Sequence, residues 1–85
     1  MYTILIVDDE RPAQTFLKAI CQKYCPAFDT ILLSGSADDA LRLMAQQHVH
    51  VLVTDISMPG INGIELAQRV RQLYPRTHTV IVSGY

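Results

Sequence analysis

Four short apolar runs alternate along this chain with three longer segments of helical periodicity, and this alternation limits the possible fold more than any other feature. The runs are rich in β-branched residues and lack regular polar alternation, which is typical of strands covered on both faces in a parallel sheet. They span residues 3–7, 30–34, 51–55 and 79–83. Repeated right-handed crossovers between such strands predict a single α/β domain with a doubly wound parallel sheet.

The three helical segments carry recognisable start and stop signals. The first opens at Pro12, a favourable first-turn residue, and ends before Pro26. The second follows Ser36, which has an acidic residue three positions later as in a capping box, and the third follows Gly63 and ends at Pro75. The residues predicted to face the sheet are, in chain order, Ala13, Phe16, Leu17, Ile20 and Tyr24; Ala37, Ala40, Leu41 and Met44; and Leu66, Ala67, Val70 and Leu73.

Composition excludes several classes of protein. A chain of 85 residues with 49% hydrophobic and 18% charged residues is ordinary for one packed domain, and its net charge of −1 offers no general attraction to nucleic acid or to an anionic membrane. No apolar run approaches the roughly 18 residues of a membrane span, and no signal peptide is recognisable. The helical spacing of Cys21 and Cys25 suits free thiols better than a disulfide. We therefore expect a cytoplasmic protein that binds neither membrane nor nucleic acid directly.

Acidic side chains follow two of the predicted strands. Asp8 and Asp9 come directly after the first strand, and Asp55 ends the third. If these strands are neighbours where the winding of the sheet reverses, the three carboxylates converge at one edge and repel one another unless a cation neutralises them. Oxygen ligands of this kind suit Mg²⁺. Alternatively, Asp8 and Asp9 merely cap the first helix, but the third carboxylate on a separate strand favours the metal site.

Two further polar positions lie at the same predicted edge. The loop after Asp55, which reads ISMPGING, is a tight connection that would expose Asp55 and present the backbone carbonyl of Ser57 to a metal. Ser83 ends the fourth predicted strand. Its hydroxyl could hydrogen-bond an anion, although a lone serine there also suits a simple turn.

Three segments together resemble a response-regulator receiver domain. They are ILIVDDE, with the acidic pair after the first strand; VLVTDISMPGINGIEL, with the phosphoacceptor strand and its loop; and TVIVSGY, with the strand that ends in serine. The resemblance covers the whole chain. It implies a flavodoxin-like fold with strand order 2-1-3-4, and a function in two-component signalling as the acceptor of a phosphoryl group from a sensor histidine kinase.

The resemblance also implies a role for each site residue. Asp55 would be the phosphoacceptor, and Ser83 would hydrogen-bond the phosphoryl group and act as the switch. Mg²⁺ would be held by Asp8, Asp9, Asp55 and the backbone oxygen of Ser57. Such a domain is not a turnover enzyme, beyond Mg²⁺-dependent phosphorylation and dephosphorylation of itself. An aspartyl phosphatase is disfavoured because Ser57 stands where that class places a second carboxylate.

Receiver domains have five strands, and this sequence stops after the fourth. We therefore expect residues 1–85 to be a receiver domain that lacks the last helix, strand and helix, together with the lysine that neutralises the phosphoryl group and any output domain. The fourth strand would be an apolar sheet edge, open to homodimerisation by edge pairing or by exchange of elements. The alternative function is a receiver fragment that is not phosphorylated and acts only as an interaction or dimerisation module.

Overall fold

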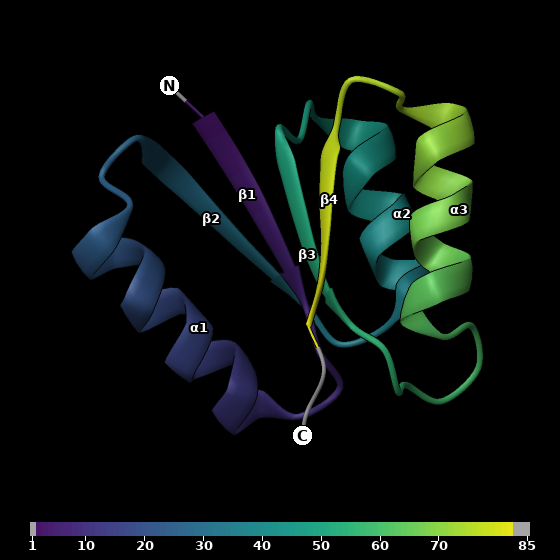
Figure 1. Ribbon diagram of the computed structural model, residues 1–85, viewed down its shortest axis with the longest axis horizontal. Coiled ribbons are helices and arrows are strands. Elements are labelled where there is room, and N and C mark those ends of the chain that lie inside the picture. The colour runs from purple at the N-terminus through teal and green to yellow at the C-terminus, as the bar shows by residue number, and fades with distance from the viewer. Residues whose placement is uncertain (1, 83–85) are drawn as a thin grey trace.

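The computed structural model describes residues 2–82, in which a parallel sheet lies between helices on both of its faces (Figure 1). The strands are ordered β2-β1-β3-β4, and each neighbouring pair is parallel, so the predicted α/β fold and strand order are confirmed. The elements in chain order are β1 (Tyr2–Val7), α1 (Arg11–Tyr24), β2 (Phe28–Ser34), α2 (Ala37–Gln46), β3 (Val51–Asp55), α3 (Gly63–Leu73) and β4 (His78–Val82). None of the described helices has the length and apolar character needed to cross a membrane.

The main core lies between the sheet and the helix pair α2 and α3. Burying these apolar side chains contributes about 25 cal/mol for each Å² removed from water, which is the main force that holds the helices to the sheet. Strands and helices both contribute buried side chains to this core, which are Leu5, Val7, Ala37, Ala40, Met44, Val49, Leu52, Met58, Leu66 and Val70. Leu73, expected to face the sheet, is exposed because Val70 and Tyr74 occupy the inner side of this last turn.

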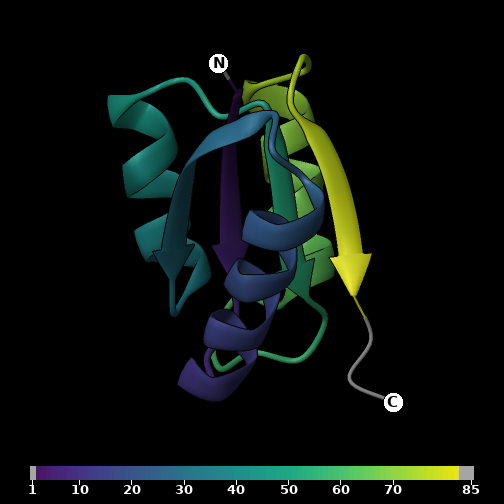
Figure 2. The same ribbon diagram turned by 90° about the vertical axis from the view of Figure 1, so that its left-hand side faces the viewer.

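Helix α1 lies by itself on the other face of the described sheet (Figures 1 and 2). Its half-buried side includes Gln14, Leu17 and Cys21, whereas Phe16 and Tyr24 are 66% and 68% exposed. The prediction that Phe16, Ile20 and Tyr24 pack inward was therefore wrong. Since no second described helix lies beside α1, the sheet covers one side of the helix and leaves the neighbouring apolar side open.

Side-chain caps define where α2 and α3 begin. The Oγ atom of Ser36 accepts the Asp39 N–H at 3.1 Å, and the Asn62 side chain accepts the Glu65 N–H at 2.9 Å. The Asp39 carboxylate bonds to Arg42 and accepts the Ser34 hydroxyl at 2.8 Å. The hydrogen bond from Arg42, followed by the one from Ser34, lowers the pKa of Asp39 below the ordinary value for an aspartic acid.

The register of β1 and β3 brings their carboxyl ends together. Val7 pairs with Thr54, so the next residue of each strand, Asp8 and Asp55, follows at the same edge of the sheet. These two strands are the neighbours at which the winding reverses direction, because β2 lies beyond β1 and β4 lies beyond β3. In folds of this class, ligands bind beyond the carboxyl ends of the strands at this reversal.

Candidate functional site

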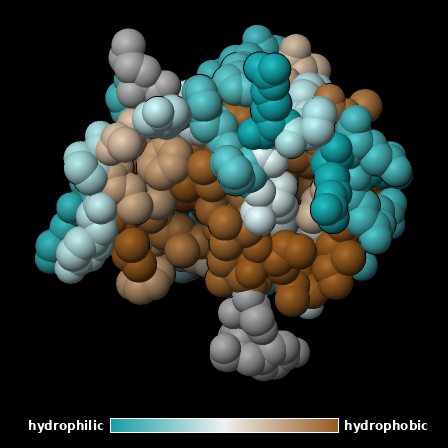
Figure 3. All heavy atoms as spheres, turned by 45° about the horizontal axis from the view of Figure 1, so that its top comes forward, coloured by the Kyte–Doolittle hydropathy of each residue, from teal (hydrophilic) through white to brown (hydrophobic). Residues whose placement is uncertain are grey.

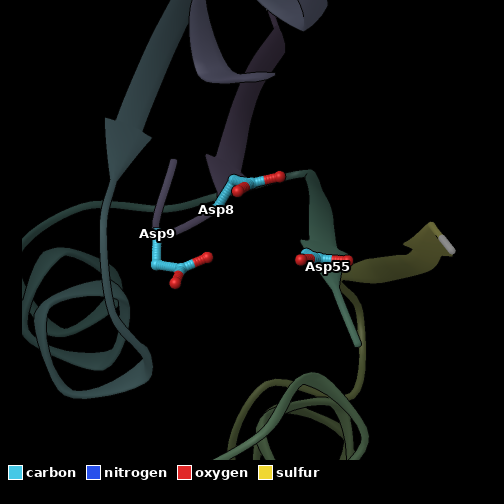
Figure 4. Close-up of side chains that lie close together, drawn as sticks. All are labelled: Asp8, Asp9 and Asp55. Atoms are coloured by element: carbon cyan, nitrogen blue, oxygen red, sulfur yellow. The ribbon is translucent and has the colours of Figure 1, made fainter. Parts of the chain in front are cut away.

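Three carboxylates meet beyond the ends of β1 and β3. One carboxylate oxygen from each of Asp8, Asp9 and Asp55 lies within 4.8 Å of the other two. Asp8 and Asp9 approach from the segment after β1, and Asp55 approaches from β3 (Figure 4). The sequence predicted this convergence from the two strand ends, and the structure places the three residues together.

The donor set fits a small, hard cation. Mg²⁺ takes oxygen ligands at about 2.1 Å in an octahedron, so two ligands on opposite sides of the ion lie about 4.2 Å apart. The three oxygens lie within 4.8 Å of one another, which is close to that distance. Three negative charges held this close also repel one another, and a divalent cation would remove this cost. The residues present therefore suit Mg²⁺, with coordination positions left for water and an anion.

Asp8 is buried and held by backbone hydrogen bonds. Its Oδ1 atom accepts the Glu10 N–H at 2.9 Å, and its own N–H donates to the Ser34 carbonyl at 3.0 Å. Glu10 is the N-cap residue of α1, and its side chain makes no capping hydrogen bond. The Asp8 carboxylate accepts the N–H of Glu10 itself, which precedes the first helical turn. Asp8 is therefore not the N-cap of α1, although its carboxylate does fix the residue at which the helix begins.

The loop after Asp55 is closed tightly against the end of β3. The N–H of Gly63 donates to the Ile56 carbonyl at 2.9 Å, and the buried Met58 anchors the middle of the loop in the core. A Cβ atom placed on Gly63 would lie 1.9 Å from the backbone oxygen of Asp55. Glycine is thus required there by close approach of two backbone segments, and this approach fixes the position of Asp55.

A hollow open to solvent adjoins the carboxylates. Asp9 and the exposed Ser57 both line it, so the loop after Asp55 and the acidic segment after β1 face the same space. The complete lining consists of Asp9, Ile56, Ser57, Met58, Pro59, Gly60 and Asn62. Ser83, the other predicted site residue, lies outside the described residues.

Sequence reasoning missed Gln14 as a neighbour of this site. Its Nε2 atom donates to the Asp8 carbonyl at 2.6 Å and to the Ser34 carbonyl at 3.1 Å. The available signal was a polar residue on the sheet-facing side of an amphipathic helix, shortly after the acidic pair.

The two cysteines, Cys21 and Cys25, are half-buried free thiols. The pKa of the Cys21 thiol is raised, mainly by its burial and to a smaller extent by the neighbouring Cys25.

Comparison with known proteins identifies a family for nearly the whole chain. Residues 4–85 match the family of response regulator receiver domains. The hydrogenase transcriptional regulatory protein HoxA of Cupriavidus necator is 35% identical over 83 residues, which are 98% of this chain. The chain spans 16% of the length of that HoxA protein, so the match concerns one part of a larger regulator.

Solved structures share the architecture described above. A two component transcriptional regulator AraC from Clostridium phytofermentans superposes with a TM-score of 0.90 at 34% identity, over 100% of this chain and 68% of its own. The response regulator protein TrrA from Thermotoga maritima, in complex with Mg²⁺ and BeF, superposes with a TM-score of 0.90 at 28% identity. That comparison covers 100% of this chain and 71% of the TrrA chain.

Proposed function

This chain belongs to the response regulator receiver domains of two-component signalling, and we propose that it accepts a phosphoryl group on Asp55 from a sensor histidine kinase. The observation that carries the proposal is the convergence of three carboxylates from two separate strand ends. The Asp8 carboxylate has a local hydrogen bond to the Glu10 N–H, but this bond does not explain why Asp9 and Asp55 also converge on it. A site for a cation beside a carboxylate nucleophile explains this convergence.

In the proposed reaction, a carboxylate oxygen of Asp55 attacks the phosphorus of a phosphohistidine. A new P–O bond forms while the P–N bond breaks, and the departing imidazole nitrogen keeps the electron pair and takes up a proton. Asp55 suits this role because it ends a strand and is only partly buried, and because Asp9 and Ile56 beside it line an open hollow. The product is an acyl phosphate on the protein, which makes the domain a phosphoacceptor switch in place of a turnover enzyme.

The other site residues have distinct parts in the proposal. Asp8, Asp9, Asp55 and the backbone oxygen of Ser57 would hold Mg²⁺. When bound, this ion supplies positive charge that offsets the charge on the carboxylates and on the transferring phosphoryl group. Asp8 contributes from a fixed position, whereas Asp9 contributes from the exposed side of the site. Ser83 would hydrogen-bond the phosphoryl group. We also propose a cytoplasmic location, in which cysteines such as Cys21 and Cys25 stay reduced.

A phosphoryl analogue tests this function without a kinase. The Mg²⁺–BeF complex of TrrA makes beryllium fluoride a suitable probe of the same site in this chain. We expect fluorine NMR to show a bound beryllium fluoride signal with the unmodified chain that requires Mg²⁺ and disappears in Asp55→Ala. A bound signal that persists in Asp55→Ala would show that the anion binds elsewhere and would contradict the assignment of Asp55.

The β4 edge favours a second candidate function, that of an interaction module. Among residues 2–82, β4 pairs with β3 alone, and its Val80 and Ile81 side chains are 48% and 42% exposed. The His78 N–H donates to the His50 carbonyl, so His78 and every second residue after it direct their backbone groups toward β3. The residues between them, Thr79 and Ile81, therefore direct their backbone N–H and C=O groups outward, away from β3. Apolar side chains gather across the middle of the face seen in Figure 3.

A second copy of the chain is the partner that we propose for this edge. Antiparallel pairing about a two-fold axis at Val80 would let Thr79 of one copy exchange two hydrogen bonds with Ile81 of the other. The two Val80 side chains would then meet across the axis. This candidate does not depend on phosphorylation, so it stands apart from the phosphoacceptor function.

A further inference from the structure

Gln14 joins the ends of two strands beside the acidic cluster. It lies in the first turns of α1, is half-buried, and its Nε2 atom donates to both the Asp8 carbonyl and the Ser34 carbonyl. Carbonyl oxygens only accept hydrogen bonds, so the side-chain atom between them is the NH₂ group, and both of its hydrogens are used. One side chain thus ties α1 to the carboxyl ends of β1 and β2.

The bond to the Asp8 carbonyl acts on the peptide that leads to Asp9. A peptide unit is planar, so holding its carbonyl oxygen fixes the orientation of the plane that joins the two residues. The side-chain carboxylate of Asp8 is held separately, by a hydrogen bond from the Glu10 N–H. We infer that Gln14 is a positioning residue for the metal site, which directs Asp9 toward Asp8 and Asp55. This inference rests on the proposed function.

The same contacts separate this role from a general role in stability. The N–H of Asp8 already donates to the Ser34 carbonyl at 3.0 Å, and Ile6 and Val7 pair with Leu33 and Ser34, so β1 and β2 stay joined without Gln14. Asp8 and Ser34 are both buried, but the Ser34 carbonyl keeps the Asp8 N–H as a donor, so removal of the amide takes a needed donor from the Asp8 carbonyl alone. Removing the amide should loosen the Asp8–Asp9 peptide much more than it loosens the fold.

The test compares Gln14→Met with Gln22→Met. The first change keeps the length of the side chain and removes its donors, and the second makes the same change at an exposed position of the same helix. Binding of Mg²⁺ to the unphosphorylated chain is measured by calorimetric titration, and folding is measured by urea unfolding without metal. Loss of a group that orients a metal ligand costs at least about tenfold in metal affinity. We expect Gln14→Met to bind Mg²⁺ about tenfold more weakly, with a urea midpoint close to that of Gln22→Met.

Each other outcome has a definite meaning. Equal Mg²⁺ affinity in Gln14→Met and the unmodified chain would overturn the inference and leave the proposed function intact. A Gln14→Met chain that fails to fold would also overturn it, because Gln14 would then serve the fold. If the unmodified chain binds no Mg²⁺ while folded, the proposed metal site fails and this inference fails with it. A backbone NMR spectrum in which the Asp9 amide signal alters in Gln14→Met but not in Gln22→Met would support the positioning role independently of metal.

Discussion

Replacement of Gly63 by alanine tests how tightly the loop after Asp55 is built. The new Cβ would lie 1.9 Å from the backbone oxygen of Asp55, 2.8 Å from its carbonyl carbon and 3.1 Å from the Cα atom of Ile56. Real Cβ atoms essentially never approach another atom closer than 3.0 Å, so the two backbone segments must separate by about 1 Å. The atoms that collide belong to the backbone at the proposed phosphoacceptor, and no side-chain rotation relieves the clash.

The expected loss of stability follows from this geometry. Overpacking of a buried site costs about 1–3 kcal/mol, and the backbone collision at Gly63 places the cost at about 3 kcal/mol. A domain of this size has a total stability of roughly 4–13 kcal/mol, so the loss is a large fraction of it. With an m-value of about 1.5 kcal/mol per molar urea, the unfolding midpoint should fall by about 2 M.

Two other glycines provide matched controls for a urea titration followed by circular dichroism. A Cβ on Gly35 would meet Gln14 at an ordinary 3.9 Å, so Gly35→Ala should change stability by less than about 0.5 kcal/mol. Gly60 has open space around it but a φ of +77°, so Gly60→Ala should cost about 1 kcal/mol in backbone strain. If Gly63→Ala unfolds at the same urea concentration as Gly35→Ala, the argument from close backbone approach is refuted.

Three further changes have defined outcomes. Asn62→Ala removes the cap on the Glu65 N–H and should lower the free energy of unfolding by about 1 kcal/mol in a urea titration, and an unchanged midpoint would rule out the cap as a stabilising contact. Because the pKa of Asp39 is lowered in the folded chain, its ionised form stabilises the fold above the ordinary aspartate pKa, and this contribution is lost as the pH falls through the lowered value. Urea midpoints of Asp39→Asn should therefore depend less on acidic pH than those of the unmodified chain, and parallel pH profiles would contradict this assignment. Val80→Lys should reduce dimer formation in sedimentation velocity because it places two charges at the proposed axis, whereas Leu73→Lys, at an exposed apolar position on α3, should not; a dimer that survives Val80→Lys is not held by β4.

The acidic cluster could be predicted because it depends on features that a sequence records. Apolar runs of five residues mark strands, and an aspartate directly after such a run must lie at the carboxyl end of the sheet. The register that pairs Val7 with Thr54 then brings Asp8 and Asp55 together. What the sequence did not supply was the difference between the two residues after β1, because the burial of Asp8 and the exposure of Asp9 depend on how the chain turns into α1.

The inward side of α1 and the role of Gln14 could not be predicted for a related reason. Phe16, Ile20 and Tyr24 form an apolar stripe as regular as that of any buried helix, and periodicity does not distinguish a stripe that meets the sheet from one that another surface would cover. The long-range bonds of Gln14 to Asp8 and Ser34 join residues whose proximity arises only once β1 and β2 pair. Strand ends differed by one or two residues, as at β2, which begins at Phe28, because pairing with β1 extends it beyond the apolar run.

The most direct test of the central claim is the intact mass of the chain after incubation with acetyl phosphate and Mg²⁺, beside Asp55→Asn treated in the same way. The account predicts a gain of one phosphoryl group that requires Mg²⁺ and is absent from Asp55→Asn. Circular dichroism of the same samples establishes that both chains are folded. A folded chain that gains no phosphoryl group, or an equal gain in Asp55→Asn, would contradict the claim that the three carboxylates form a working phosphoacceptor site.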